Sequence, residues 1–210
     1  MALIQITGPV LEPVTLDELK NHLRLSTVLT VEDALLNSYI TVARKQAENF
    51  TRRQLCDATW RLILPGFPYS TYALELPRPP LTTVSSEITV GYMDSSYSTQ
   101  ALGTTFYTVD YNSVLPRIYP SKNSSHENSW GDIDLASVYN AVVIDYVSGY
   151  SSASTGTAVR VPEEIQVWIK MKAGMLYNYR EPVTLDDYRR IPQEHFNGLL
   201  DAYVIAGEAT

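Results

Sequence analysis

The stretch PVTLDELKNHLRL, residues 13–25, carries the clearest helix signal in the chain. Thr15 and Glu18 have the spacing of a capping box, in which each side chain accepts a hydrogen bond from the other residue's backbone N–H. Pro13 stands just upstream, where it disfavours helix. Three leucines then recur at the spacing of one helical face: Leu16, Leu19 and Leu23. These residues predict a short amphipathic helix that ends at about Leu25.

Three further helices follow from similar signals. Residues 30–33 (TVED) resemble a second cap and predict a longer helix to about Arg53. Pro162 and the two glutamates after it predict a third helix to about Tyr179, and residues 193–205 predict a last one. The longer helix has one apolar face, formed by Leu36, Ile40, Ala43, Ala47 and Phe50.

The pattern changes to that of strands between residues 58 and 158. Short runs rich in β-branched and aromatic residues, separated by prolines, cover 59–64, 73–76, 88–92, 106–110, 117–119 and 141–147. Such runs predict a small antiparallel sandwich or barrel. We therefore expect an α+β chain. Its helical bundle is formed by the N- and C-terminal segments, residues 1–57 and 159–210, with a β domain, 58–158, inserted between them.

Composition narrows the class of protein. The 210 residues carry 16 Lys plus Arg against 23 Asp plus Glu, a net charge of -7, which argues against tight wrapping by nucleic acid and against anionic membranes. No apolar run reaches the ~18 residues of a membrane span, and the N-terminus lacks a secretory signal. Cys56 is the only cysteine, so no disulfide forms within the chain and the residue is expected to be buried. These features predict a soluble protein of a reducing compartment.

No enzyme is predicted. His22, His126 and His195 lack the spacing of a zinc site, and the common nucleotide-binding and acyl-transfer motifs are absent. No cofactor or metal site is therefore predicted, although oxygen-bearing side chains in residues 121–134 leave calcium open. A hydrolase based on Cys56 or His126 would need an acidic or histidine partner in a cleft. The 15 tyrosines fit either protein contacts or sugar stacking, so an aromatic-rich glycan-binding module, as in an adhesin, remains the alternative.

Several short motifs, in order, resemble the head–tail connector (adaptor) proteins of tailed phages. The capped helix at residues 13–25 comes first, followed by the acidic start and alanine-rich body of a second helix at 32–48. A proline-rich segment, LPRPPL, then spans 76–81. The later motifs are Tyr92–Asp94, Tyr107–Asp110, Gly149–Tyr150, Val161–Ile165 and Tyr177 with Arg180 and Glu181. One departure is the turn Ser95-Ser96-Tyr97, which lacks the expected glycine.

The resemblance implies a structural virion protein at the head–tail interface, made in the host cytoplasm. Such proteins form a ring, commonly of about twelve copies, that docks under the portal protein and presents a platform for stopper or tail-completion proteins. Double-stranded DNA would pass through the lumen without specific binding, and no membrane is involved. A phage-like particle would fit the same motifs.

Two sets of residues are candidates for assembly. The last predicted helix has an apolar stripe at i, i+3, i+4, i+7 and i+8, and we expect it to dock into a portal groove or to pack on its own subunit. This stripe consists of Phe196, Leu199, Leu200, Tyr203 and Val204. Candidate intersubunit ion pairs use Arg44, Arg78, Arg180 and Glu181, which could equally be ordinary surface charges.

Overall fold

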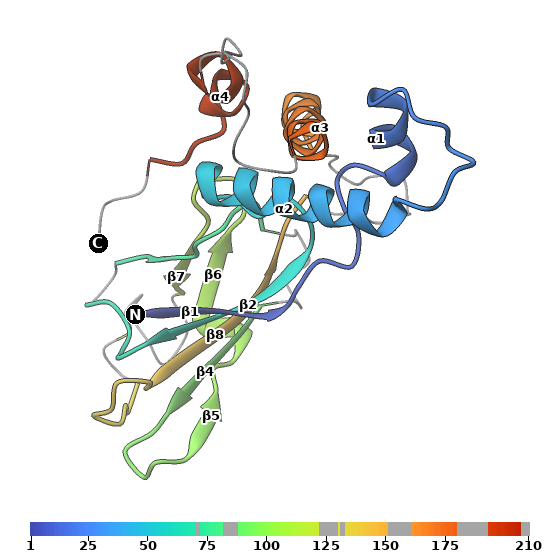
Figure 1. Cartoon of the computed structure of the whole chain (residues 1–210). Helices are drawn as coiled ribbons and strands as arrows, with labels where there is room; N and C mark the ends of the chain where they lie inside the picture. Colours follow the sequence, from blue (N-terminus) through green and yellow to red (C-terminus); the bar gives the residue numbers. More distant parts are fainter. Residues whose placement is uncertain are drawn as a thin grey trace. The chain divides into compact units, whose positions relative to one another are not determined.

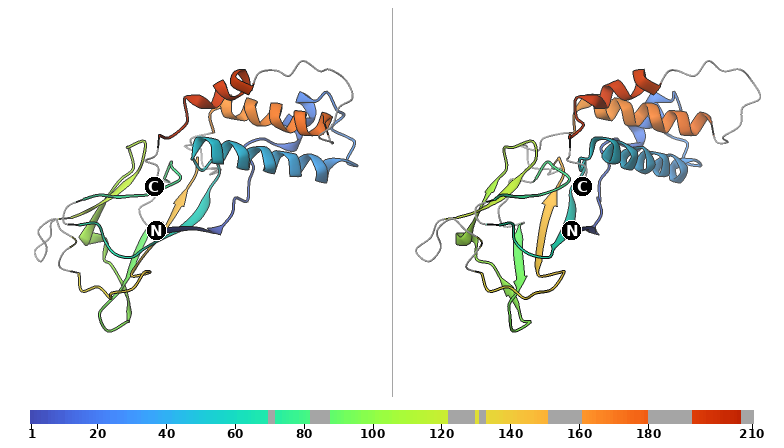
Figure 2. Two further views of the ribbon diagram at one scale, coloured as in Figure 1. Left: turned by 60° about the vertical axis from the view of Figure 1, so that its left-hand side comes forward. Right: turned by 90° about the vertical axis from the view of Figure 1, so that its left-hand side faces the viewer.

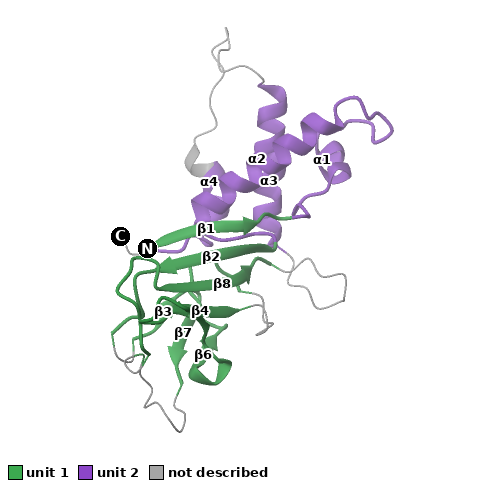
Figure 3. Ribbon diagram, turned by 90° about the horizontal axis from the view of Figure 1, so that it is seen from below, with its two compact units in different colours: residues 1–9, 57–151 green, residues 10–56, 152–210 purple. Residues whose placement is uncertain are grey.

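The computed structural model describes residues 1–69, 72–81, 88–121, 130, 133–150, 161–179 and 193–206 (Figure 1). The chain forms two compact units, coloured separately in Figure 3. Unit 1 consists of Met1–Pro9 and Asp57–Ser151, and unit 2 of Val10–Cys56 and Ser152–Thr210. Unit 1 contains antiparallel sheets and unit 2 contains helices, which confirms the prediction of an α+β chain with antiparallel sheets.

The expected assignment of residues 1–57 to the helical part is wrong at its N-terminus. Strand β1 (Ala2–Thr7) pairs antiparallel with β2 (Ala58–Leu64), so that Ala2 lies opposite Ile63 and Gln5 opposite Trp60. Met1–Pro9 therefore belongs to unit 1, and the β unit is not a simple insertion. The physical reason is that backbone pairing with β2 satisfies the hydrogen bonds of a segment that no helical signal covers.

In the part of unit 1 that the structure describes, the strands form two antiparallel sheets. The first has the order β1-β2-β8-β4-β5 and the second β3-β7-β6. The remaining bounds are β3 Leu74–Glu75, β4 Thr89–Met93, β5 Thr99–Ala101, β6 Tyr107–Asp110, β7 Arg117–Pro120 and β8 Val142–Ser148, and a 3-10 turn, η2, covers Thr104–Phe106. Each strand predicted within 59–147 is present with its ends shifted by a residue or two. The sequence patterns did not predict β1 or β5.

The core of unit 1 lies between the two sheets. Along β8 buried and half-buried positions alternate, so that Val142, Ile144 and Tyr146 point to the same buried side. They join one apolar cluster with residues of the second sheet, including Leu74, Tyr107 and Ile118. Two sheets that share one core form a sandwich, one of the two predicted arrangements.

The described residues of unit 2 form four helices, α1 (Leu16–His22), α2 (Asp33–Thr51), α3 (Glu163–Asn178) and α4 (Gln193–Asp201). The most extensive helix contact is between α2 and α3, and both views of Figure 2 show α3 (orange) running alongside α2 (cyan to blue). The last helix ends at Asp201, four residues before the expected end at Ile205.

The start of α1 forms as predicted, whereas the start of α2 does not. Thr15 Oγ1 accepts a hydrogen bond from the Glu18 N–H at 3.2 Å, and a carboxylate oxygen of Glu18 accepts one from the Thr15 N–H at 2.7 Å. The N-cap of α2 is Glu32 rather than Thr30, and its side chain makes no capping bond. That carboxylate instead accepts a hydrogen bond from the Tyr177 hydroxyl of α3 at 2.6 Å.

The turn between β4 and β5 closes without the expected glycine because Tyr97 takes the left-handed conformation, with φ 60°. Asp94 supplies the rest of the turn. Its carboxylate accepts hydrogen bonds from the N–H groups of Ser96 at 3.0 Å and Ser98 at 2.9 Å. The backbone N–H of Ser98 and the side chain of Gln100 hold the pKa of Asp94 below its usual range.

Replacing Tyr97 by glycine should stabilise the protein. The left-handed conformation costs a side-chain-bearing residue ~1–2 kcal/mol, and the extra freedom of glycine in the unfolded chain offsets part of that gain. We expect Tyr97→Gly to raise the free energy of unfolding by up to ~1 kcal/mol in urea titrations. Tyr97→Ala is the control, because it removes the same exposed ring and keeps the strain. An equal gain in both variants would contradict this explanation.

Candidate functional site

The part of the chain that the structure describes offers no group of three or more His, Cys, Asp or Glu side chains placed to hold a metal ion. Among the same residues no helix is long and apolar enough to cross a membrane. Most of the loop 121–134, including His126, lies outside the described residues.

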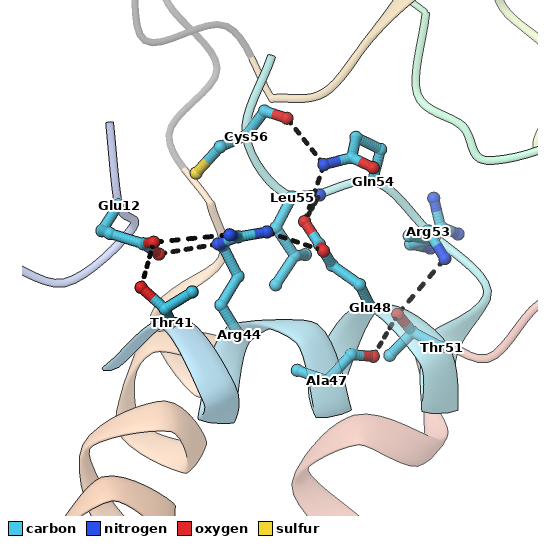
Figure 4. Close-up of polar contacts among 10 residues, drawn as sticks. All are labelled: Glu12, Thr41, Arg44, Ala47, Glu48, Thr51, Arg53, Gln54, Leu55 and Cys56. Atoms are coloured by element: carbon cyan, nitrogen blue, oxygen red, sulfur yellow. Dashed lines mark hydrogen bonds and ion pairs between the residues drawn. The ribbon is translucent and has the colours of Figure 1, made fainter. Parts of the chain in front are cut away.

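A buried charge network lies around Arg44 in unit 2 (Figure 4). Arg44 Nε donates to Glu12 Oε2 at 2.7 Å, and its Nη1 donates to Glu48 Oε2 at 2.8 Å. The other Glu12 oxygen accepts from the Thr41 hydroxyl at 2.8 Å. The other Glu48 oxygen accepts from the Gln54 side chain at 2.8 Å and from a backbone N–H at 3.1 Å. Both carboxylates thus face an arginine that is 3% exposed.

The two carboxylates outweigh the cost of burying the guanidinium. Burial alone lowers the pKa of Arg44, but the hydrogen bonds and charges of Glu12 and Glu48 exceed that effect and raise it overall. The network ties the segment before α1 to α2 and, through Glu48, to the chain that leaves α2 at residues 54 and 55. Arg44 therefore acts inside the subunit, which removes it from the candidate intersubunit contacts.

The other candidate charges have different positions. The guanidinium of Arg78 lies over the ring of Trp60, 5.6 Å from its centroid, and so contacts its own unit. Arg180 and Glu181 lie outside the described residues. The structure therefore places only Arg44 and Arg78 among these four candidates, and each of the two contacts its own unit.

The stripe predicted for portal docking mostly contacts its own unit. Leu200 is fully buried, and the Phe196 ring packs beside Trp168 of α3 with centroids 5.1 Å apart. The Tyr203 hydroxyl donates to Glu164 at 2.9 Å. Leu199 is half-buried and Val204 is exposed. An amphipathic helix gains stability by burying its apolar face, and in the structure most of this stripe is buried within unit 2.

The α1–α2 loop exposes apolar side chains while its backbone is fixed. The ammonium of Lys20 is buried, donates to Leu29 O at 2.7 Å and pairs with Asp33 at 2.5 Å. The loop that it holds presents Val28 and Val31, which are 85% and 92% exposed. A fixed apolar loop of this kind is typical of an interaction surface.

The proline-rich segment 76–81 is fixed within unit 1. Buried Tyr146 donates from its hydroxyl to Pro77 O at 2.8 Å, and Gly149 N–H donates to Pro80 O at 2.9 Å. Burial raises the pKa of Tyr146 far above its usual range, so the hydroxyl keeps its proton. The segment directly follows β3 of the second sheet, and these two hydrogen bonds attach it to the end of β8 in the first sheet.

Sequence reasoning missed Glu12, Lys20 and Glu48. A signal existed for Lys20, which lies four residues after Leu16 and therefore on the apolar side of α1. Glu48 likewise follows Arg44 by one helical turn. Both residues are buried on α2, so the buried face predicted for this helix should have included them. Phe50, which we expected in that stripe, is exposed, and Thr51 is buried in its place.

Comparison with known proteins agrees with the sequence motifs. Residues 13–91 match the model of a family described as phage gp6-like head-tail connector protein. This match confirms, over those residues, the resemblance to tailed-phage head–tail connectors. No curated protein sequence matches the chain significantly.

Three solved structures are similar over the whole chain. A chain in the neck of an empty gene transfer agent (GTA) particle with C6 symmetry has 20% identity and a TM-score of 0.73, with all of both chains covered. A chain in the virion of the native particle has 19% identity and a TM-score of 0.73, covering 100% of this chain and 98% of that one. A chain in the neck of the native particle with C12 symmetry has 19% identity, a TM-score of 0.69 and full coverage of both. At this identity the likeness establishes the fold.

Removing the charge of Arg44 should destabilise unit 2. Arg44→Met leaves Glu12 and Glu48 facing each other without a counter-ion, and we expect a loss of ~3–5 kcal/mol in the free energy of unfolding. Lys45→Met, on the exposed side of the same helix, should change it by less than ~0.5 kcal/mol. Urea titrations of both variants provide the measurement. A loss below ~1 kcal/mol for Arg44→Met would show that the network contributes little.

Removing the Tyr146 hydroxyl should loosen the proline-rich segment. Tyr146→Phe leaves the Pro77 carbonyl without this donor, and we expect the protein to lose ~1–2 kcal/mol of stability. Tyr139→Phe is the matched control, since Tyr139 is 95% exposed and should be neutral. Thermal melting compares the two. Equal melting temperatures would mean that the hydrogen bond does not hold the segment.

Proposed function

We propose that this chain is the subunit of a head–tail connector, a structural ring at the neck of a tailed phage or a phage-like particle. The observation that carries the proposal is the family match over residues 13–91. Within it lie the capped helix α1, helix α2 with its buried network, and the proline-rich segment held by Tyr146. The match therefore includes elements of both units.

The similar structures support the ring arrangement. They come from particle necks with C6 and C12 symmetry, and the similarity spans all of this chain. In a closed ring each subunit uses two different surfaces, one toward each neighbour. We therefore propose a ring of about twelve copies.

The partners follow from the place of such a ring. We propose that it docks under the portal protein, extends the DNA channel and carries stopper or tail-completion proteins, at the head–tail interface of a virion assembled in the host cytoplasm. A net charge of -7 suits a channel through which DNA passes without binding, because lumenal cations would hold phosphates. The role requires no catalysis and no cofactor.

We do not propose that the whole apolar stripe of α4 docks into the portal protein. Phe196, Leu200 and Tyr203 already contact α3 or other parts of unit 2. The fixed apolar loop at Val28 and Val31 is the better candidate for contact with another neck protein, because its side chains are uncovered.

The glycan-binding alternative has less support. It requires exposed tyrosine or tryptophan rings in one plane on the β unit. Tyrosines are exposed there, including Tyr69, Tyr97 and Tyr139, but the tryptophans already have partners within their units. Trp130 stacks on Phe67 with centroids 4.8 Å apart, and Trp168 lies beside Phe196. Trp60 lies under the guanidinium of Arg78.

The direct test is mass photometry of the purified chain, alone and with the portal protein encoded beside it. We expect a portal-dependent species whose mass corresponds to about a dozen copies of the 23.5 kDa chain. Arg44→Met provides a variant with a destabilised unit 2, which should assemble poorly. A chain that stays monomeric in the presence of folded, ring-shaped portal would contradict the connector function.

A further inference from the structure

Strand β1 leaves one side of the five-stranded sheet open. It is the first strand in the order β1-β2-β8-β4-β5 and pairs with β2 alone among the described residues. Its sequence, ALIQIT, has no charge, proline or glycine. Ile4 and Ile6 are 46% and 50% exposed. Edge strands are normally blunted by lysine, proline or a cover. The sequence of β1 has neither lysine nor proline, and no described strand pairs with its outer side.

The chemistry of this edge defines what binds to it. Along its open side β1 presents backbone N–H and C=O groups in the repeat of an extended strand. The partner that satisfies such a row is another extended strand, by β-augmentation. The bulge between Gln5 and Thr7 limits the regular part of the edge to about Ala2–Gln5. The partner strand is therefore short.

The strand at the other edge of the same sheet is also short and exposed. Strand β5 (Thr99–Ala101) is three residues long, and all three are exposed. All neighbours in the sheet are antiparallel, and an odd number of strands makes β1 and β5 run in the same direction. A copy related by a simple rotation can therefore place its β5 beside β1 as a parallel pair.

We propose that β1 of one copy pairs with β5 of the next copy, so that the sheets of neighbouring subunits continue into one another around the ring. The inference rests on the proposed connector ring. A head-to-tail ring joins two different surfaces, which excludes pairing of β1 with β1. Closing the ring gives every β1 and β5 edge a partner and leaves none exposed, as in a closed barrel.

Hydrogen exchange on the unmodified chain tests the pairing. In the isolated chain the outward-facing amides of β1 should exchange rapidly. In the portal-bound ring they should slow by at least about tenfold, because each gains a carbonyl partner. The amides of β2, paired on both sides in the isolated chain, serve as the internal control. If rings form and β1 exchange is unchanged, the pairing is wrong and the connector function stands. If no ring forms with portal, both fail.

Disulfide trapping tests the identity of the partner strand. Gln5→Cys is combined in turn with Thr99→Cys, Gln100→Cys and Ala101→Cys, all at exposed positions. Oxidised rings should give a ladder of covalent oligomers up to about twelve for at least one pair, since bridged Cα atoms must lie within ~7 Å. The native Cys56 is buried, so the wild-type chain is the blank. A dimer from Gln5→Cys alone, or no ladder from any pair, would overturn the proposal.

Discussion

Arg44 carries a permanent positive charge into the interior of unit 2, where it costs several kcal/mol unless carboxylates are fixed beside it. That requirement constrains three segments together. Glu12 must reach Arg44 from the chain before α1, and Glu48 must follow one turn later on α2. The second oxygen of Glu48 then sets the path of residues 54 and 55 as they leave the helix. The chain that leaves α2 is thus held by a charged side chain of the same helix.

Unit 1 depends on a comparable constraint that involves neutral groups. Proline has no backbone N–H group to donate. At its prolines, the segment 76–81 can therefore bond to the rest of unit 1 only through carbonyl groups, which need donors. Tyr146 and Gly149, both near the end of β8, supply them. A proline-rich turn is a weak motif by itself. In this chain the turn, which lies within the family match, is attached to the central strand of the sheet.

Sequence patterns predicted the parts in which apolar burial repeats regularly. The capping box at Thr15 and the β-branched strand predicted at 141–147 both appear in the structure as expected. Patterns failed where burial depends on a partner from elsewhere in the chain. Lys20 and Arg44 look like surface residues until carbonyl groups and Glu12 are placed beside them. The pairing of β1 was missed because its partner, β2, lies about fifty residues later in the chain, and a short extended segment does not show which strand it joins.

Two features bring little stability to an isolated chain but can stabilise contacts in a ring: the exposed apolar loop between α1 and α2, and the edge of β1. Lys20 holds a loop whose apolar side chains cover nothing, so the order that it imposes brings no burial within the subunit. Fixing a loop before association lowers the entropy lost on binding, which favours a contact that forms in many copies at once. An unblunted β1 edge follows the same logic, because backbone groups without a partner in one chain can be satisfied by the next. In the proposed ring, therefore, the loop and the edge are stabilising features whose contribution appears only on assembly.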